Sequence, residues 1–384
     1  MNLTKEHPLA ECIEDLSVVH VVRQYAPMIG GLEDFVRQLV SRQRGRFRNL
    51  RVVTLDRLFT EPDRKLPMHE EIEGVDVHRI PYHGSKRYPL APGVFSQVAD
   101  ADLVHVHAVD YFFDALALSN VFRRKKLVAT THGGFFHTDA FMALKKVWLN
   151  GPTRLSASFY DAIACCSAND FEMFNKIAPS KVTLIENGVD CDKFRNASSQ
   201  DPVKRIVTIG RFSKNKRLDM LLKALHDLVA RDADWHLDII GSPSDLSVED
   251  LRALVARLDL EHHVDFHIRV SEEEMRQVMS ACSLFASASE YEGFGIAMVE
   301  ALSAGLIPVV APNTAFKSLA VKHPAVRLTS FENPQEAALA ITRAGEDLAL
   351  DPDMRMAAMT SAEQNSWDAA VRHYDDFYRK AVTA

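Results

Sequence analysis

The hydrophobic pattern alternates between two kinds of stretch along the chain. Short runs of apolar and β-branched residues are separated by stretches with apolar residues at helical spacing, such as Leu32–Ser41 and Tyr111–Phe122. Runs that are apolar at nearly every position predict strands buried on both faces, as in parallel sheets. The predicted strands are Leu16–Val22, Arg51–Leu55, Val75–Ile80, Leu103–His107, Leu127–Thr131, Ala162–Cys166 and Val182–Ile185, then a second series of Arg205–Ile209, His236–Ile240, Val264–His267, Leu284–Ala286, Ile307–Val310 and Val326–Leu328.

Two series of alternating strands and helices predict an α/β fold with two doubly wound, Rossmann-like domains. The join falls in Phe194–Pro202, which is polar and lacks periodicity, so we expect domains over 1–196 and 197–366. The last stretch, 367–384, is helical and aromatic. It either crosses back to complete the first domain or caps the second, and the pattern alone leaves both open.

Composition and charge narrow the class of protein. The chain has 384 residues, of which 47% are hydrophobic and 25% charged, as expected for two globular domains. Neither a signal-peptide core in Met1–Ala10 nor an apolar run of about 18 residues is present, so we expect a cytoplasmic protein. The net charge of −7 argues against a nucleic-acid partner, and the five cysteines lack zinc-ligand spacing.

Open α/β sheets bind ligands beyond the carboxyl ends of their strands, so the residues that follow each strand are the candidates for a site. Gly30 and Gly31 lie between the first strand and a helix, where backbone amides can approach a phosphate. Such a pair is equally typical of a tight turn. The glycine fingerprint of dinucleotide-binding domains is missing, which disfavours a nicotinamide dehydrogenase.

A basic turn follows the first strand of the second domain. Gly210–Arg217 (GRFSKNKR) holds four cations between a strand and a helix. Arginine and lysine there would neutralise a diphosphate, although an exposed basic turn is common. Arg211 and one of Lys214 and Lys216 are the candidates, and the sequence does not decide between the two lysines.

The most specific segment is Glu290–Ile296 (EYEGFGI), which leads into a helix that contains Glu300. The amides of Gly293–Phe294–Gly295 lie at a helix N-terminus, where they can bind an anion or sugar oxygens. Glu292 and Glu300 can hold two parts of one extended ligand. A charged Glu300 in an apolar helix needs a polar partner, for which ribose hydroxyls would serve. The alternative is a structural carboxylate that caps neighbouring amides.

One histidine lies at the carboxyl end of a predicted strand. His132 directly precedes Gly133–Gly134, a context that favours a ligand-binding role over the structural role usual for a single histidine. His105, His107 and His137 are weaker candidates.

Together these motifs resemble the family 4 retaining glycosyltransferases. The E-x7-E element Glu292–Glu300, the GRFSKNK turn, the Gly30–Gly31 pair and Glu186–Asp190 occur in the same order over nearly the whole chain. The resemblance implies a GT-B fold, with two Rossmann-like domains facing a deep cleft. It also implies retention of anomeric configuration and no metal or other cofactor.

Two further segments resemble the bacterial α-mannosyltransferases of xanthan- and acetan-type polysaccharide assembly, namely Thr130–Thr138 and Arg87–Pro89. That resemblance implies GDP-mannose as donor, and α-1,3 transfer to a cellobiosyl unit on a polyprenyl diphosphate in exopolysaccharide biosynthesis. The alternatives are another sugar nucleotide or acceptor, a sugar-nucleotide epimerase or phosphorylase of the same fold, and a non-catalytic sugar-nucleotide binding subunit.

The resemblance also implies a role for each candidate residue. Arg211 and Lys216 would hold the donor diphosphate, assisted by the amides of Gly30 and Gly31. Glu300 would bind the ribose. Glu292 would face the hydroxyls of the transferred hexose, with the amides of Gly293, Phe294 and Gly295 nearby. His132 would lie close to the same sugar.

Metal-dependent glycosyltransferases of another fold use a D-x-D pair, which makes the acidic pairs of this chain a second place to look. Three such pairs occur, Asp100/Asp102, Asp190/Asp192 and Asp232/Asp234. In a chain with 52 acidic residues chance matches are expected, so we predict no metal.

A polyprenyl-linked acceptor would place the enzyme on the inner face of the bacterial inner membrane as a peripheral protein. The stretch after the fifth predicted strand has large apolar residues at Phe135, Phe136 and Trp148, with Lys145 and Lys146 among them. An amphipathic helix of this composition predicts contact with lipid headgroups and the acceptor. The alternative is that the aromatic side chains are core and the lysines solvated.

Overall fold

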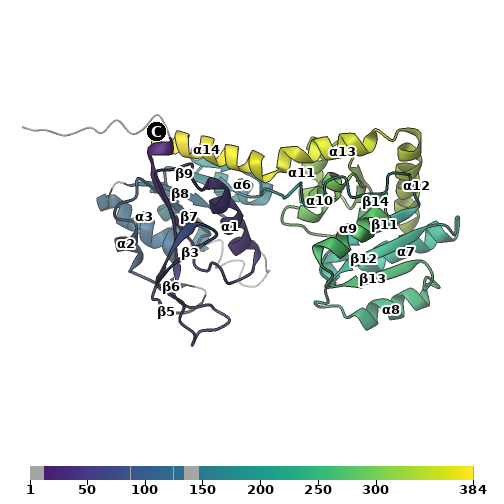
Figure 1. Ribbon diagram of the computed structural model, residues 1–384, viewed down its shortest axis with the longest axis horizontal. Coiled ribbons are helices and arrows are strands. Elements are labelled where there is room, and N and C mark those ends of the chain that lie inside the picture. The colour runs from purple at the N-terminus through teal and green to yellow at the C-terminus, as the bar shows by residue number, and fades with distance from the viewer. Residues whose placement is uncertain (1–12, 87, 124, 134–146, 384) are drawn as a thin grey trace, which may run out of the picture. The chain divides into compact units, whose positions relative to one another are not determined.

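The computed structural model describes residues 13–86, 88–123, 125–133 and 147–383. It divides into two compact units (Figure 1). Unit 1 consists of Met1–Gly188 with Trp367–Ala384, and unit 2 of Val189–Ser366. The first boundary therefore lies at Gly188, before the polar segment in which the sequence placed it, and the final helix belongs to unit 1.

Unit 1 is built on a mostly parallel sheet with the strand order β10-β9-β8-β7-β1-β2-β4-β3, in which β3 alone is antiparallel to its neighbour. The described strands of the sheet are β1 (Ser17–Val21), β2 (Asn49–Leu55), β3 (His69–Ile72), β4 (Val75–Ile80), β7 (Leu103–His107), β8 (Lys126–Thr130), β9 (Ala162–Cys165) and β10 (Val182–Leu184), and a separate pair is formed by β5 (His83–Gly84) and β6 (Pro89–Leu90).

Helices cover both faces of this sheet. This is seen from alternate residues of its strands, which pack in two different hydrophobic cores. Val19 and Val21 of β1 pack in a cluster with side chains of α2, α3 and α5, whereas Val18 packs with side chains of α1 and α14. The described helices of unit 1 are η1 (Ile13–Asp15), α1 (Gly31–Gln43), α2 (Val94–Gln97), α3 (Tyr111–Arg123), the π-helix η2 (Leu149–Thr153), α5 (Arg154–Ser158), α6 (Ala168–Asn175) and α14 (Trp367–Thr383).

Unit 2 has a parallel sheet with the order β13-β12-β11-β14-β15-β16. From β11 the chain adds strands on one side as far as β13, and it then adds β14 to β16 on the other side of β11. The strand order therefore reverses between β11 and β14. The strands are β11 (Arg205–Ile209), β12 (His236–Gly241), β13 (Val264–Ile268), β14 (Leu284–Ser287), β15 (Ile307–Val310) and β16 (Arg327–Leu328). The helices are η3 (Lys214–Lys216), α7 (Leu218–Val229), α8 (Val248–Arg257), α9 (Glu272–Ser280), α10 (Ile296–Ala304), α11 (Thr314–Lys322), α12 (Pro334–Leu350), α13 (Met354–Ala362) and η4 (Glu363–Asn365).

The prediction of two doubly wound, Rossmann-like domains is confirmed by these sheets. In unit 2 the point where the strand order reverses lies between β11 and β14, and ligands of such sheets bind at this point. The loops after these two strands are Gly210–Arg217 and Ala288–Gly295. The fold therefore brings both segments that the sequence singled out to one edge of one sheet. Within the described part of the chain, no helix is long and apolar enough to cross a membrane.

Candidate active site

The loop after β11 is tightly folded against the end of the sheet. Gly210 has φ of 156° and Arg217 has φ of 48°. A Cβ on Gly241, at the end of the neighbouring strand, would lie 1.9 Å from the carbonyl oxygen of Gly210. A Cβ on Gly210 would itself lie 3.0 Å from Lys216 Cε. The missing side chain at Gly210 therefore leaves the space in which the stem of Lys216 lies.

Lys216 and Glu292 form an ion pair that joins the two loops. Lys216 Nζ donates a hydrogen bond of 2.6 Å to Glu292 Oε1, and both side chains are largely buried. The loops are also joined by backbone, because the amide of Glu290 donates to the carbonyl of Asn215 at 3.0 Å and the Asn215 side chain donates to the carbonyl of Tyr291 at 2.8 Å. The sequence treated the lysine and the glutamate as separate candidates, and the structure places them in direct contact.

The structure also distinguishes the other cations of the turn. Arg211 is exposed and forms no ion pair within the described part of the chain. Lys214 is exposed too, and its backbone amide donates to the carboxylate of Asp245. Arg217 is bound to Glu290 and Glu332. Of the two lysines between which the sequence could not decide, Lys216 is therefore the one held beside Glu292.

Glu300 lies on α10, whose N-cap is Gly295 with φ of 99°. The carboxylate is mostly buried and faces Lys193, whose Nζ lies 3.6 Å from Glu300 Oε1 and 3.0 Å from Glu272 Oε1. Burial raises the pKa of Glu300, and the ammonium of Lys193 acts in the opposite direction. Burial lowers the pKa of Lys193, but the two carboxylates outweigh burial and raise it overall.

Sequence reasoning missed Lys193. A polar partner for Glu300 was expected from a ligand, and the protein itself supplies a lysine. The signal was available only indirectly, because Lys193 lies three residues after Asp190, the last residue of the motif Glu186–Asp190. Asp190 accepts the backbone amide of Lys193 at 3.2 Å and so holds the start of this turn.

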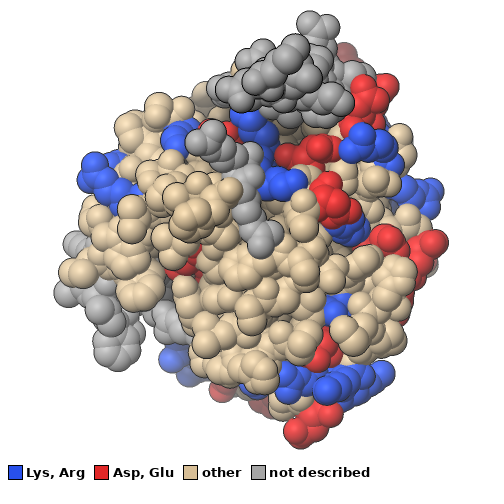
Figure 2. All heavy atoms as spheres, turned by 90° about the vertical axis from the view of Figure 1, so that its left-hand side faces the viewer, with Lys and Arg blue, Asp and Glu red and all other residues tan. Residues whose placement is uncertain are grey.

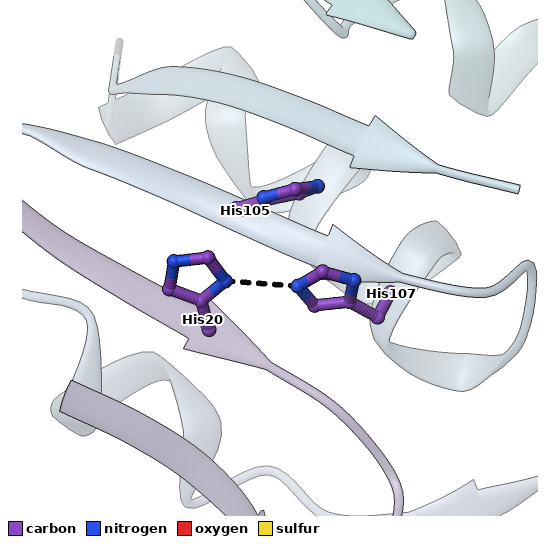
Figure 3. A group of neighbouring side chains, drawn as sticks. All are labelled: His20, His105 and His107. Carbon is purple, nitrogen blue, oxygen red and sulfur yellow. Dashed lines mark hydrogen bonds between the residues drawn. The ribbon is translucent and has the colours of Figure 1, made fainter. Parts of the chain in front are cut away.

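In unit 1, His132 follows β8 with φ of 51° and belongs to a group of neighbouring histidines. Its Nε2 lies 3.1 Å from His107 Nδ1, and His107 Nε2 lies 2.9 Å from His20 Nδ1. Figure 3 shows His20 on β1 pointing toward His107 on β7, with His105 beside them. His105 Nδ1 and Nε2 are instead bonded to Tyr378 and Thr130 at 2.7 and 2.8 Å.

Burial keeps this histidine group neutral. It lowers the pKa of His20 to about 3 and that of His132 to about 3. Burial also lowers the pKa of His105 and His107 well below the usual value, and the neighbouring imidazoles add to this effect. At neutral pH these rings are therefore uncharged groups that donate through one nitrogen and accept through the other.

Other candidates of unit 1 are placed less decisively. Gly30 is the N-cap of α1 in extended conformation, and a Cβ there would lie 2.3 Å from Glu33 Oε2. The carboxylate of Glu33 therefore lies close to the amides expected to meet a phosphate, and a Cβ on Gly31 would contact nothing. Trp148 is 44% exposed. The remaining residues of the predicted membrane helix lie outside the described part of the chain: Phe135, Phe136, Lys145 and Lys146.

Acidic residues of the D-x-D pairs form hydrogen bonds and ion pairs with other residues of the protein. Asp102 accepts the amide of Ser17 and a guanidinium hydrogen of Arg48, each at 2.8 Å. Asp232 is paired with Lys204, and Asp192 with Arg195. Among the residues that the structure describes, three groups of side chains have atoms close enough to hold a metal ion, namely His20/His105/His107, His69/Asp76/His78 and His236/Asp238/Asp265.

Two family models match the chain: "Glycosyltransferase Family 4" over residues 29–193 and "Glycosyl transferases group 1" over residues 191–361. A GDP-mannose:cellobiosyl-diphosphopolyprenol alpha-mannosyltransferase of Xanthomonas oryzae is 38% identical, over 96% of this chain and 97% of the relative. This chain belongs to the family 4 glycosyltransferases. An enzyme with the same printed name from Komagataeibacter xylinus is 36% identical to this glycosyltransferase, over 96% and 94% of the two chains.

Solved structures agree on the fold. The crystal structure of Anabaena Alr3699/HepE in complex with UDP has a TM-score of 0.72 to this glycosyltransferase at 20% identity, and covers 94% of it and 99% of its own chain. A sucrose-phosphate synthase of Thermosynechococcus elongatus has a TM-score of 0.68 at 17% identity, with coverages of 95% and 98%. The GT-B architecture implied by the sequence motifs is thereby confirmed for this glycosyltransferase.

Proposed function

We propose that this glycosyltransferase moves mannose from GDP-mannose, with retention of configuration, to a cellobiosyl unit on a polyprenyl diphosphate in exopolysaccharide biosynthesis. The similarity to relatives that carry this activity in their names supports the donor and the acceptor. The observation that carries the proposal within the molecule is the Lys216–Glu292 pair, which sets a cation and a hydroxyl-binding carboxylate 2.6 Å apart at the ligand-binding edge of unit 2.

In the proposed reaction the bond between the anomeric carbon and the diphosphate oxygen breaks as the acceptor oxygen bonds to the same face of that carbon. The acceptor proton passes to the leaving phosphate oxygen. Lys216 and Arg211 stabilise the charge that develops on this leaving group, an electrostatic effect that fixed cations supply well. Glu292 accepts hydrogen bonds from sugar hydroxyls, and no enzyme nucleophile is required.

Glu300 is proposed to bind the ribose of the donor. The Lys193–Glu300 contact of 3.6 Å is loose, so one carboxylate oxygen can accept ribose hydroxyls while the lysine neutralises the buried charge. For unit 1, contact of His132 with the transferred sugar and of the Gly30–Gly31 amides with the diphosphate remain predictions from the family resemblance.

A donor screen tests this proposal. We expect radiolabelled mannose to pass from GDP-mannose to cellobiosyl-diphosphopolyprenol at an undiminished rate in excess EDTA, because fixed cations at Arg211 and Lys216 take the role that Mg²⁺ has in other transferases. UDP- and GDP-linked hexoses serve as controls. Loss of transfer in EDTA with recovery in Mn²⁺ or Mg²⁺ would contradict the metal-free proposal. Conversion of the donor without an acceptor would indicate an epimerase.

We also propose that unit 1 contacts the inner membrane surface peripherally, and the described residues suggest where. Figure 2 views unit 1 from the side on which α2 and α3 lie, and shows a broad field without Lys, Arg, Asp or Glu. On α3, which packs against α5, Leu118 and Phe122 are 52% and 89% exposed, and Leu155 of α5 is 56% exposed. Arg154 beside Leu155 is exposed as well, which favours anionic lipid.

Co-sedimentation with vesicles tests this contact. We expect the double variant Phe122→Glu with Leu155→Glu to bind anionic phospholipid vesicles at least tenfold more weakly than the wild type, because it replaces apolar contact with repelled charge. Val321→Glu is the matched control, since Val321 is 87% exposed on α11 of unit 2. Equal binding of both variants would show that this face of unit 1 does not meet lipid.

A further inference from the structure

Three histidines of unit 1 are joined end to end by their ring nitrogens. The line starts at His20 Nδ1, passes through both nitrogens of His107 and ends at His132 Nε2, with nitrogen–nitrogen distances of 2.9 and 3.1 Å. His20 and His107 are fully buried, whereas His132 is partly exposed where β8 meets its loop. The line therefore runs from the centre of the sheet to the carboxyl end of its strands, where doubly wound domains bind ligands.

Packing fixes the outer ring of this line. The rings of Phe35 and His132 pack edge to face, with their centroids 4.6 Å apart. On the following residue, the amide of Gly133 donates to Asp170 Oδ2 at 2.7 Å, and the hydroxyl of Thr131 donates to the same oxygen at 2.6 Å. His132 is thus held from both sides of its backbone and from one side of its ring. Its Nδ1 is the nitrogen that the line leaves free to meet a ligand.

Because every ring in the line is neutral, each hydrogen bond contains one proton and the tautomers are coupled. If His20 carries its proton on Nδ1, His107 must carry its own on Nδ1, and so must His132. The opposite order places the proton of His132 on Nε2 and turns its Nδ1 into an acceptor. The tautomer of His20 therefore determines whether Nδ1 of His132 is a hydrogen-bond donor or an acceptor.

His20 ends the line inside the sheet. Its Nε2 is buried and has no hydrogen-bond partner among the described residues. The buried Gln43 side chain opposes the lowering of the His20 pKa by burial. Because the three rings are coupled, all of them follow one of the two orders.

A metal centre is the competing interpretation of this cluster, because nitrogens of His20, His105 and His107 lie within 4.8 Å of one another. Both nitrogens of His107 are, however, already engaged within the line, and both nitrogens of His105 are engaged by Tyr378 and Thr130. A metal ion would have to break at least one hydrogen bond at each of these two rings. The geometry therefore favours a hydrogen-bonded line.

We propose that His20 and His107 are positioning residues that hold His132 neutral and in a single tautomer, so that its Nδ1 forms one defined hydrogen bond to an oxygen of the bound ligand. The inference rests on the proposed function only in taking that oxygen to belong to the transferred sugar. A neutral ring suits this position because positive charge develops on the sugar during transfer. An imidazolium would oppose that charge, whereas a neutral imidazole forms a hydrogen bond with the hydroxyl without adding to it.

NMR spectroscopy of ring-labelled histidine tests the tautomer without any turnover. The His132 signals are assigned by their loss in His132→Gln. Between pH 6 and 8 we expect the chemical shifts of a neutral imidazole in one tautomer that do not move with pH. In His107→Leu, the same signals should shift toward the other tautomer or begin to titrate. A protonated ring or an averaged pair of tautomers in the wild type, or stoichiometric zinc in the purified protein, would overturn the proposal.

Kinetics on two matched variants tests the positioning role. His107→Leu and His105→Leu each replace one buried imidazole in the same strand and each remove two hydrogen bonds. We expect His107→Leu to lower kcat tenfold or more, as misplaced reacting groups do, with KM for the donor changed less than threefold. His105→Leu should keep kcat within threefold. Equal losses of kcat would indicate a merely structural effect and overturn the proposal.

Failure of the proposed mannosyl transfer can be distinguished from failure of the proposal about the His132 tautomer. If GDP-mannose is not the donor, no variant and no wild-type protein transfers mannose, yet the tautomer of His132 is still measured in the free enzyme. If His107→Leu does not fold, His20→Leu takes its place, since it removes only the inner hydrogen bond of the line. A wild-type tautomer of His132 in the variant that folds would show that the line does not control His132.

Discussion

Replacing Lys216 or Arg211 with alanine is expected to lower kcat for mannosyl transfer about a hundredfold, because each removes a cation worth about 3 kcal/mol to the developing charge on the leaving diphosphate. For Lys216 a second effect acts in the same direction. Its loss leaves the mostly buried Glu292 without the ammonium that now lies 2.6 Å away. The carboxylate would then repel the diphosphate instead of being neutralised beside it.

Lys214→Ala is the matched control for this prediction. Lys214 lies in the same short 3-10 turn as Lys216, but its side chain is exposed and contacts no carboxylate within the described residues. We expect it to keep kcat within threefold of the wild type. Single-turnover rates at saturating donor, with thermal unfolding as the check on folding, decide the matter. A loss for Lys214→Ala equal to that for Lys216→Ala would mean that the turn acts only through its total charge.

Acid is expected to unfold unit 1 steeply. Four neutral histidines have pKa values lowered by burial, to about 3 for His20 and His132 and well below the usual value for His105 and His107. Since an unfolded histidine titrates near 6.5, the unfolded chain binds up to four more protons than the folded one as pH falls from 6.5 toward 3. Stability is therefore fully present above pH 6.5 and is lost below it.

Two buried carboxyls of unit 1 oppose this trend. Burial raises the pKa of Asp110 to about 6, so the folded protein takes up a proton there below pH 6, which offsets the effect of one histidine on stability. Burial also raises the pKa of Asp375, which acts in the same direction. The net difference is at most about three protons, which corresponds to a slope of up to about 4 kcal/mol per pH unit near pH 5. A domain stable by about 10 kcal/mol at neutral pH would then unfold two to three pH units below 6.5.

Urea titrations between pH 7 and 5 measure that slope. The chain has three tryptophans, and Trp235 is the one in unit 2, so Trp235→Phe makes fluorescence report on unit 1 alone. His105→Leu should reduce the slope by about 1.4 kcal/mol per pH unit, since it removes one proton from the difference. A stability of unit 1 that stays constant from pH 7 to 5 would contradict the assigned neutrality of the histidines.

The sequence predicted the sheets because their strands are buried on both faces and so read as apolar runs. β4, β7, β11 and β15 have the predicted bounds, and the other predicted strands differ by a residue or two. β3 was missed because His69–Ile72 is mostly polar and alternates little, as an antiparallel edge strand can. Its place is set by pairing with β4 and not by a burial pattern of its own.

The candidate site, like the fold, could be predicted only in part from the sequence. Glu292, Glu300 and Lys216 are detectable from sequence because each lies within a few residues of a strand or helix end. The contact between Lys216 and Glu292, the placement of Lys193 beside Glu300 and the line of histidines depend on which strands are neighbours. His20 contacts His107 only because β1 and β7 pair in parallel. The register of this pairing cannot be predicted from the spacing of residues along the chain.

The return of α14 to unit 1 has a consequence for how this protein is made. Trp367 packs on Gly188, where a Cβ would lie 2.5 Å from its ring, and the buried hydroxyls of Tyr374 and Tyr378 bond to Thr130 and His105. While the ribosome synthesises unit 2, for roughly ten seconds or more, the first part of unit 1 lacks the helix that covers one face of its sheet. A nascent chain at that stage exposes an apolar surface that chaperones can recognise, and unit 2 can be complete before unit 1 is.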